Sequence, residues 1–293
     1  MKPAPFDYLA AASVEEAVAA LAAYGDDAVV LAGGQSLVPL LNMRLARPSV
    51  VVDVNRVAAL AGIAANGVTT VGALTRQAAA LRSPLLAERA PLLVAALAQV
   101  GHVATRSRGT IGGSAAHADP AAELPAVLLA LDATLVLRGP EGERVVAAAD
   151  FFQGPFTTAR HSTELLTAVR LPAAPAGSRH GFHEVARRHG DFALAGAAVV
   201  VAPAPPGAVR HVRIALFGVA PCAFRAVAAE AALTAGAPAE QVAALAAAAA
   251  EPHDDTHATA AYRRRAVHVC VLRALAAVGA AGGTEPGAGE GAR

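Results

Sequence analysis

Aromatic and basic residues are scarce in this sequence. It contains no tryptophan, three tyrosines and eight phenylalanines among 293 residues, and its formal net charge is only +1. No run of lysine and arginine residues with interleaved aromatic side chains occurs. Proteins that bind nucleic acids need basic patches for the phosphates and aromatic rings for the bases. The composition therefore argues against a nucleic-acid partner.

Cysteine is equally scarce, with Cys222 and Cys270 far apart in the sequence and no C-x-x-C pair. This spacing supports neither an iron–sulfur cluster nor a cysteine-ligated zinc ion, and it favours a chain that stays reduced in the cytoplasm. Residues 1–7 lack the apolar core of a signal peptide. The alanine-rich run at residues 242–250 is too short to span a membrane, so we expect no membrane span.

Two glycine pairs, each close to hydroxyl side chains, form the most distinctive pattern. One lies in residues 31–36 (LAGGQS), the first glycine segment, and the other in residues 106–114 (RSRGTIGGS), the second glycine segment. Without a Cβ atom, glycine lets ligand atoms approach the backbone closely and adopts positive φ at little cost, so successive N–H groups can converge on an anion. One pair alone is typical of a tight turn. We expect both segments to be loops, and two such loops in one chain favour a ligand with two phosphates, such as a dinucleotide.

The N-terminal part of the sequence predicts a β–loop–α–β unit. A capping-box helix at residues 13–24 precedes two apolar runs, at residues 28–32 and 50–54, that are typical of buried strands. Between these strands, Ser36 can cap a helix that extends through Leu45. The first glycine segment would then lie at a helix N-terminus, where unpaired N–H groups and the helix dipole favour an anion.

The rest of the chain divides at a small, proline-rich stretch, residues 172–177. Before this stretch we expect hairpins around residues 66–67 and 139–142, a strand at 164–171, and helices at 75–82, 91–100 and 120–131. After it we expect three strands and then three helices, at residues 181–187, 193–202, 209–219, 224–235, 239–249 and 259–278. The pattern predicts an α+β fold with an N-terminal domain at residues 1–175, a C-terminal domain with a three-stranded sheet and helices at residues 178–281, and a disordered tail at residues 282–293.

Common catalytic motifs do not occur in this sequence. The fingerprint G-x-G-x-x-G does not follow the first apolar strand, which disfavours a Rossmann fold, and the hydrolase motif G-x-S-x-G is missing. His253 and His257 are four residues apart, but the residues between them do not complete H-E-x-x-H, so we interpret this stretch as the start of a helix. No general base or nucleophile stands out, and we do not expect the chain to transform a substrate by itself.

The two glycine segments and their flanks resemble the flavin subunit of the molybdenum hydroxylases, which is the medium chain of carbon monoxide dehydrogenases and the central flavin module of xanthine dehydrogenases. The matching stretches are AGGQS with an apolar helix that ends in Arg44, and TIGGS followed by AAHADPAAELP. In the C-terminal half, residues 187–193 (RRHGDFA), 252–257 (PHDDTH) and 261–263 (AYR) match in the same order. The resemblance covers nearly the whole chain and implies a two-part FAD-binding region of the PCMH/VAO type, followed by a C-terminal domain.

By this resemblance, the two glycine segments wrap the FAD pyrophosphate, chiefly through backbone N–H groups. The residues so assigned are Ala32, Gly33, Gly34, Gln35, Ser36, Thr110, Ile111, Gly112, Gly113 and Ser114. A carboxylate that matches Glu123 contacts FAD in xanthine dehydrogenase-like members, and Asp119 is a second candidate that could equally cap a helix. Leu165, Phe182 and His183 match further flavin-contacting positions.

Several of these positions depart from the usual residues of the family. Serine occupies positions 107 and 114, where asparagine is common, Phe182 replaces a tyrosine, and His183 replaces a lysine. Serine still donates a hydrogen bond, whereas phenylalanine can only pack on the flavin ring. The charged residues Arg187, Arg188 and Asp191 form either a solvated strand end or part of the flavin environment, where a cation would stabilise negative charge on reduced flavin.

The resemblance also implies two partner subunits and a dimer of heterotrimers. A large subunit with a molybdenum cofactor would hydroxylate the substrate, and a small subunit with iron–sulfur clusters would pass the electrons to FAD in this chain. The external acceptor would be NAD, a quinone or oxygen, and the flavin itself would supply the redox chemistry. Two alternatives stay open at this point: a self-sufficient flavin oxidase, and a flavin-free scaffold subunit.

Overall fold

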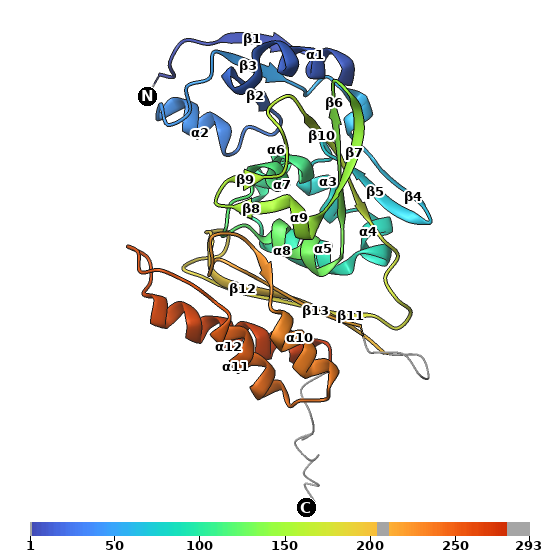
Figure 1. The fold of residues 1–293 in the computed structure, drawn as a ribbon, viewed down its shortest axis with the longest axis vertical. Helices are drawn as coiled ribbons and strands as arrows, with labels where there is room; N and C mark the ends of the chain where they lie inside the picture. Colours follow the sequence, from blue (N-terminus) through green and yellow to red (C-terminus); the bar gives the residue numbers. More distant parts are fainter. Residues whose placement is uncertain (1, 204–210, 280–293) are drawn as a thin grey trace, which may run out of the picture.

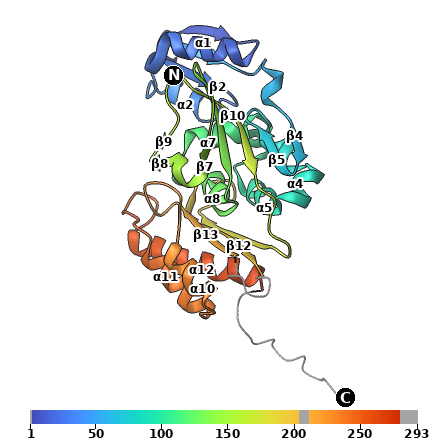
Figure 2. The ribbon, with the colours of Figure 1, turned by 45° about the vertical axis from the view of Figure 1, so that its right-hand side comes forward.

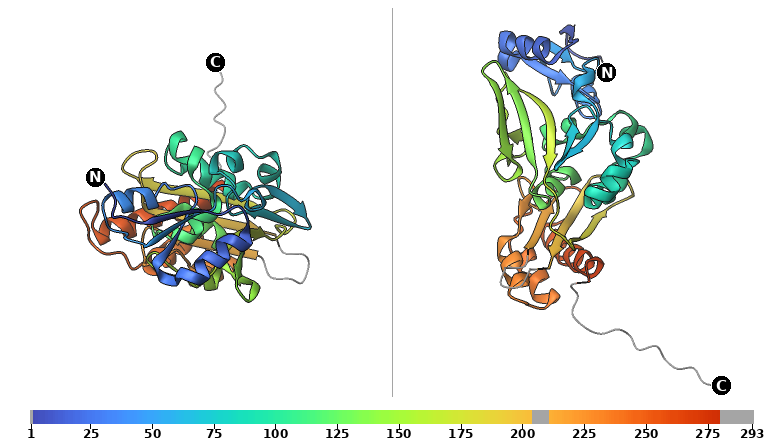
Figure 3. Two further views of the ribbon diagram at one scale, coloured as in Figure 1. Left: turned by 90° about the horizontal axis from the view of Figure 1, so that it is seen from above. Right: turned by 90° about the vertical axis from the view of Figure 1, so that its right-hand side faces the viewer.

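The protein forms three tiers that are stacked along its long axis (Figure 1). The computed structural model describes residues 2–203 and 211–279, and the predicted tail at residues 282–293 lies outside them. From top to bottom, the tiers are an N-terminal subdomain, a middle subdomain and a C-terminal domain, and a side view shows the same order (Figure 3, right). Each tier combines helices with a sheet, which confirms the α+β class.

The N-terminal subdomain contains the predicted β–loop–α–β unit. Its elements are β1 (Asp7–Ala10), α1 (Val14–Tyr24), the 3-10 helix η1 (Gly25–Asp27), β2 (Ala28–Leu31), α2 (Leu37–Asn42) and β3 (Val50–Asp53). Strand β3 pairs in parallel with β2, as expected, and also with β1, which was not predicted. The capping box is confirmed, because Oγ of Ser13 accepts a hydrogen bond from the N–H of Glu16 at 3.1 Å.

Helix α2 is shorter than the sequence predicts, and Ser36 does not cap it. Ser36 already has helical backbone angles (φ −100°, ψ −46°), and its side chain makes no capping hydrogen bond. The helix ends at Asn42 because Arg44 adopts a left-handed conformation (φ 58°) and the N–H of Leu45 bonds back to the carbonyl of Leu40 at 2.9 Å. The Ser36 hydroxyl is therefore not engaged at the helix terminus.

The middle subdomain has a five-stranded antiparallel sheet with the order β4-β5-β10-β6-β7. Its strands are β4 (Ile63–Asn66), β5 (Val68–Gly72), β6 (Thr134–Gly139), β7 (Gly142–Ala147) and β10 (Leu165–Leu171), with a separate pair β8 (Phe152–Gly154) and β9 (Thr157–Thr158). Its helices are η2 (Ala58–Leu60), α3 (Gln77–Leu81), α4 (Pro84–Arg89), α5 (Pro91–Gln99), α6 (Val103–Arg108), α7 (Ile111–His117), α8 (Glu123–Ala130) and α9 (Ala148–Phe151). Both predicted hairpins are confirmed.

The glycine pair of the second glycine segment lies in a helix, whereas the sequence predicts a loop. Gly112 and Gly113 lie in the first turn of α7, and neither has a positive φ. Thr110 caps this helix, since its Oγ1 accepts a hydrogen bond from the N–H of Gly113 at 3.0 Å. Helices α4, α6 and α7 have only six or seven residues, so no amphipathic repeat marks them in the sequence.

Asp119 does not cap the helix that follows it. Helix α8 begins only at Glu123, and Ala122 is its N-cap residue. Asp119 instead forms a local turn, in which its Oδ1 accepts a hydrogen bond from the N–H of Ala121 at 2.9 Å. Ala118, just before it, is in the left-handed conformation (φ 50°), so the chain bends sharply between α7 and α8.

The C-terminal domain has a four-stranded sheet rather than the three strands expected. Its elements are β11 (Arg179–Ala186), β12 (Ala193–Ala202), β13 (His211–Phe217), β14 (Phe224–Arg225), α10 (Val227–Thr234), α11 (Ala239–Ala248) and α12 (Ala260–Ala277). Residues 224–225 were predicted as the start of a helix, but they pair with β13. Residues 209–210 of the predicted third strand lie outside the described residues.

The sheet of the C-terminal domain is covered on both faces. Helices α10–α12 lie on its outer face, while α5 and α8 of the middle subdomain pack on the inner face (Figure 2). Every residue of the central strand β12 is buried as a result, which explains its continuous small and apolar sequence. Within the described residues, no helix combines the length and the apolar character needed to cross a bilayer.

Candidate cofactor site

A cavity of about 580 Å³ lies where the three tiers meet. Both glycine segments line it, together with residues from the start of α8, from β10 and from the segment before β12. Of the residues predicted from the sequence, it brings together Ala32, Gly33, Gly34, Gln35, Ser36, Thr110, Gly112, Gly113, Ser114, Asp119, Glu123 and Leu165. Ile111 is fully buried and packs in the core of the middle subdomain instead.

The first glycine segment connects β2 to α2 and passes close to the second segment. A Cβ atom on Gly33 would collide with the backbone carbonyl of Arg108, and Gly34 has a positive φ (71°). Only glycine tolerates both conditions easily. Among the described residues, the N–H groups of residues 33–36 have no hydrogen-bond acceptor in the protein. These donors therefore offer an anion-binding concavity, as the sequence predicts.

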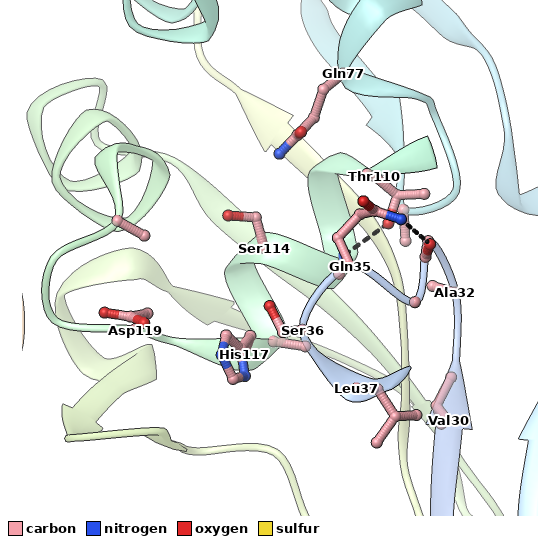
Figure 4. Close-up of a pocket in the computed structure, with 18 of the residues that line it drawn as sticks. Val30, Ala32, Gln35, Ser36, Leu37, Gln77, Thr110, Ser114, His117 and Asp119 are labelled. Atoms are coloured by element: carbon pink, nitrogen blue, oxygen red, sulfur yellow. Dashed lines mark hydrogen bonds between the residues drawn. The ribbon is translucent and has the colours of Figure 1, made fainter. Parts of the chain in front are cut away.

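The second glycine segment offers the cavity close backbone approach rather than N–H donors. The N–H of Gly112 bonds to the carbonyl of Ala73 at 2.8 Å, and that of Gly113 to Oγ1 of Thr110 at 3.0 Å. The N–H groups of Ile111 and Ser114 are also occupied, by backbone carbonyls at 3.0 and 3.2 Å. What remains available here is the hydroxyl of Ser114, which faces the same hollow as Ser36 (Figure 4).

Asn55 and Arg76 link the two glycine segments by hydrogen bonds, and neither residue was predicted from the sequence. Nδ2 of Asn55, just after β3, donates a hydrogen bond to the carbonyl of Ala32 at 2.8 Å. The guanidinium of Arg76 bonds to the Asn55 side chain and to the carbonyl of Arg108 at 2.6 Å. No motif marks these residues, because the atoms that they bond across the two segments are distant in the sequence.

The cavity contains a buried carboxyl group that stays protonated at neutral pH. Glu123 is 6% exposed, and its burial, strengthened by the nearby charges of Glu184 and Asp119, raises its pKa to about 8. Burial also raises the pKa of Glu184 to about 7. A neutral carboxylic acid donates one hydrogen bond and accepts others. Glu123 can therefore donate to a ligand hydroxyl or carbonyl as well as accept from it.

Arg160 and His117 also line the cavity, and no sequence motif marks either residue. Nη1 of Arg160 donates to the carbonyls of Glu164 (2.7 Å) and His161 (2.9 Å), and burial lowers its pKa. The ring of His117 packs at a tilt on Phe156, with centroids 5.0 Å apart, and burial lowers the pKa of His117. Arg160 thus places a cation on the cavity wall, while burial disfavours the charged form of His117.

The C-terminal domain contributes residues 190–192 to the cavity. Gly190 packs so closely on the connection between α5 and α6 that a Cβ atom would lie 2.6 Å from Cε1 of His102. The carboxylate of Asp191 pairs with Nε of Arg188 at 3.2 Å, and this arginine points into solvent. Part of the segment 187–193, which the resemblance placed near the flavin, therefore lines the cavity. The residues that line it are Gly190, Asp191 and Phe192, and Arg187 and Arg188 are not among them.

Phe182 and His183 do not belong to the cavity lining formed by the described residues. The two side chains lie on opposite faces of β11. Phe182 stacks on Phe217 in the core, with ring centroids 5.7 Å apart, and Nε2 of His183 lies 3.0 Å from Nη1 of Arg273 on α12. Phe192 is 65% exposed, so it is the phenylalanine with a ring available at the cavity.

Two protein families match consecutive parts of the chain. Residues 4–174 match the FAD binding domain in molybdopterin dehydrogenase, and residues 180–278 match the CO dehydrogenase flavoprotein C-terminal domain. The chain belongs to the FAD-binding subunits of the molybdopterin dehydrogenases. Its cofactor is FAD, and the family consists of oxidoreductase subunits.

Similar proteins of the same length support this assignment. The chain is 44% identical over 281 residues to the 6-hydroxypseudooxynicotine dehydrogenase complex subunit alpha of Paenarthrobacter nicotinovorans, covering 94% of this chain and 95% of that one. It is 39% identical to the carbon monoxide dehydrogenase medium chain of Hydrogenophaga pseudoflava, covering 94% and 97%. The solved structure of carbon monoxide dehydrogenase from H. pseudoflava superposes with a TM-score of 0.91 at 40% identity, covering 96% of this chain and 99% of that one.

The residues of this FAD-binding subunit fit a dinucleotide. The unpaired N–H groups of residues 33–36 suit a pyrophosphate, and the neutral acid of Glu123 suits hydroxyl or carbonyl groups. Val30, Leu37 and Leu165 line the part of the cavity next to the N-terminal subdomain, where an aromatic base could pack. A second hollow, of about 320 Å³, adjoins the other side of the first glycine segment.

Proposed function

We propose that this chain is the electron-transfer subunit of a heteromeric molybdenum hydroxylase. Its FAD would take electrons from the iron–sulfur clusters of a small partner subunit and pass them to an external acceptor. The observation that carries this proposal is the cavity between the two glycine segments, whose unpaired N–H groups and buried Glu123 suit FAD. Among the residues that the structure describes, no three His, Cys, Asp or Glu side chains are grouped so that they could hold a metal ion. The chain has only two cysteines, too few for the four ligands of an iron–sulfur cluster, so the clusters would reside on another chain.

Within this proposal, the residues of the chain bind and orient FAD, which supplies the redox chemistry when bound. The N–H groups of residues 33–36 and the hydroxyls of Ser36 and Ser114 would hold the pyrophosphate. Gly112 and Gly113, which line the cavity, would present their backbone to it. Asp119, Glu123 and Leu165 would contact the remainder, with Glu123 keeping its proton at neutral pH.

The proposal includes a large subunit with the molybdenum cofactor and a dimer of heterotrimers in the cytoplasm. Similar proteins are named as subunits of dehydrogenases, for example the caffeine dehydrogenase subunit beta of a Pseudomonas strain and the glyceraldehyde dehydrogenase medium chain of Sulfolobus acidocaldarius. Both cysteines of this chain, Cys222 and Cys270, are free thiols, which is consistent with a reducing compartment.

Anaerobic mixing tests the relay directly. The isolated chain loaded with FAD should be bleached by dithionite or by a reduced acceptor such as NADH, but not by aldehydes, purines or carbon monoxide. Addition of the iron–sulfur and molybdenum subunits should restore bleaching by the substrate of the complex. Rapid bleaching of the isolated chain by such a substrate would instead establish a stand-alone oxidase, and a complex without FAD would establish a scaffold.

A further inference from the structure

The buried side-chain amide of Gln77 has an oxygen atom without a hydrogen-bond partner in the described part of the chain. Gln77 is the first residue of α3, and its backbone N–H bonds to the carbonyl of Gly109 at 2.9 Å. Its side chain is only 4% exposed, and its Oε1 has no hydrogen-bond partner among the described residues. The side chain lines the cavity and extends toward its interior (Figure 4).

The side chain of Gln77 packs directly against a glycine. A Cβ atom on Gly109 would collide with Oε1 of Gln77, so glycine at position 109 leaves room for the amide. Two other buried polar atoms in the described part of the chain lack partners, Nε2 of His180 and Oε2 of Glu184, but neither residue lines the cavity. An unpaired buried amide is costly, and such groups in native proteins call for an explanation. A ligand that completes the hydrogen bonds is the explanation that the position in the cavity favours.

Contacts place Gln77 at the end of the cavity that the C-terminal domain closes. Gly109, which touches Gln77, also approaches the backbone of Thr105, and Thr105 packs on Gly101. Gly101 in turn meets Gly190, two residues before the exposed ring of Phe192. This end therefore reaches the surface, where a redox-active ring can exchange electrons with a partner. Val30 and Leu37 lie at the other end of the cavity, away from Gln77 (Figure 4).

We propose that the side-chain amide of Gln77 hydrogen-bonds the imide edge of the flavin ring, the edge on which one N–H lies between two carbonyl groups. A carboxamide presents a donor and an acceptor side by side, and a 180° turn exchanges them, so it complements this edge in either orientation. The proposal rests on the proposed function, because it requires FAD in this cavity. It identifies Gln77 as a residue that recognises the ring rather than the pyrophosphate.

The first experiment compares FAD affinity with the stability of the apoprotein in Gln77→Met. Methionine fills similar volume without polar atoms. Loss of two hydrogen bonds should weaken FAD binding about tenfold or more, measured by quenching of flavin fluorescence. The melting temperature of the apoprotein should be unchanged or higher, because an unpaired buried amide is removed. A Gln77→Met apoprotein that melts lower and binds FAD with wild-type affinity would show a structural role and overturn the proposal.

Thr75→Val is the matched control. Thr75 is buried near Gln77 and does not line the cavity in the described structure, and its Oγ1 bonds to both the N–H and the carbonyl of Gly62 at 3.1 and 2.9 Å. This variant should lower the melting temperature of the apoprotein and leave the affinity for FAD unchanged. The two variants thus distinguish a buried group that is hydrogen-bonded within the protein, Thr75, from one that hydrogen-bonds a ligand, Gln77.

A second experiment identifies the edge that is recognised. FAD methylated at the imide nitrogen lacks the ring donor, so the wild type should bind it more weakly than FAD, whereas Gln77→Met should bind the two alike. If Gln77→Met instead weakens ADP and FAD equally and still discriminates against the methylated FAD, Gln77 recognises the adenine and the proposal is wrong. If the wild type binds no FAD, the proposed function fails together with this inference.

Discussion

Nη2 of Arg76 donates a hydrogen bond to Oδ1 of Asn55 at 2.7 Å, across a separation of 21 residues. The same guanidinium bonds to the carbonyl of Arg108 in the second glycine segment, while Asn55 bonds to the carbonyl of Ala32 in the first. One arginine therefore joins the two segments that line the FAD cavity. Their relative position depends on a side-chain network rather than on direct backbone pairing.

The first prediction is that Arg76→Ala loosens FAD without unfolding the chain. Without the guanidinium, the two glycine segments are no longer joined through Asn55, so FAD affinity should fall about tenfold. Arg76→Lys should rescue little, because a single ammonium group does not reproduce the two-pronged geometry. Equilibrium dialysis of FAD against the apoprotein measures the effect.

Arg170→Ala is a suitable control for the loss of an arginine. Nη2 of Arg170 pairs with Oε1 of Glu143 at 3.0 Å between partly exposed side chains, and exposed pairs contribute little. This variant should bind FAD like the wild type. Equal affinity in Arg76→Ala and Arg170→Ala would show that the Arg76 network does not position the cavity.

The second prediction concerns Gly113 in the first turn of α7. A Cβ atom there would lie 2.6 Å from Oγ1 of Thr110 and 3.7 Å from Cβ of Ala32. Gly113→Val should therefore displace the Thr110 cap and fill the space between the two glycine segments. The flavin content of the purified complex should fall sharply, while circular dichroism shows a folded chain. Full flavin content with normal turnover in this variant would exclude the second glycine segment as part of the site.

Gly154→Ala provides the comparison for that experiment. A Cβ atom on Gly154 would meet Cβ of Thr157 at 3.9 Å, which is ordinary van der Waals contact, and its φ is not positive. This glycine lies in β8 and does not line the cavity in the described structure. The flavin content of the Gly154→Ala complex should equal that of the wild-type complex.

The third prediction is that the contribution of Glu123 to the stability of the apoprotein falls as the pH rises. Burial raises the pKa of Glu123 from its ordinary value of 4.5 to about 8, so the folded state holds this proton more tightly than the unfolded state. The favourable contribution is complete below pH 4.5 and is lost as the pH rises through about 8. The slope from this group is at most about 1.4 kcal/mol per pH unit.

Urea denaturation of the apoprotein between pH 5 and pH 8, at constant ionic strength, measures how the free energy of unfolding depends on pH. Glu123→Gln should flatten the profile, since the amide does not titrate, and Glu123→Gln combined with Glu184→Gln should flatten it further because burial also raises the pKa of Glu184. A slope that is identical in wild type and in both variants would mean that Glu123 titrates normally.

Sequence patterns predicted the elements whose signals are local. The capping box at Ser13, the hairpin at Asn66 and the buried strand β12 are each encoded in a few adjacent residues, and the structure confirms them. Ser36 was misassigned as a cap because a hydroxyl residue before an apolar run is the usual cap signature, whereas here the helical turn begins before it. The second glycine segment was misassigned as a loop because glycine normally disfavours helices.

The candidate site divides in the same way. The glycine segments could be found by composition, but Gln77 and Asn55 could not, since each contributes through contacts with chain segments that are remote in the sequence. The resemblance assigned Phe182 to the flavin, whereas in the structure Phe192 lines the cavity and Phe182 stacks on Phe217. Which residues line the cavity depends on tertiary packing, and no local pattern in a single sequence predicts that packing.

The last prediction uses these two phenylalanines as a matched pair. Phe182 stacks on Phe217 at the junction of the middle subdomain and the C-terminal domain, whereas Phe192 is 65% exposed at the cavity. Phe182→Ala should lower the free energy of unfolding by roughly 2–4 kcal/mol, because a packed ring is lost, and should leave the flavin spectrum of the folded protein unchanged. Phe192→Ala should leave stability nearly unchanged but make bound flavin more accessible, seen as stronger quenching of its fluorescence by iodide. The reverse pattern, with flavin accessibility altered by Phe182→Ala alone, would place the flavin ring against β11 and return Phe182 to the site.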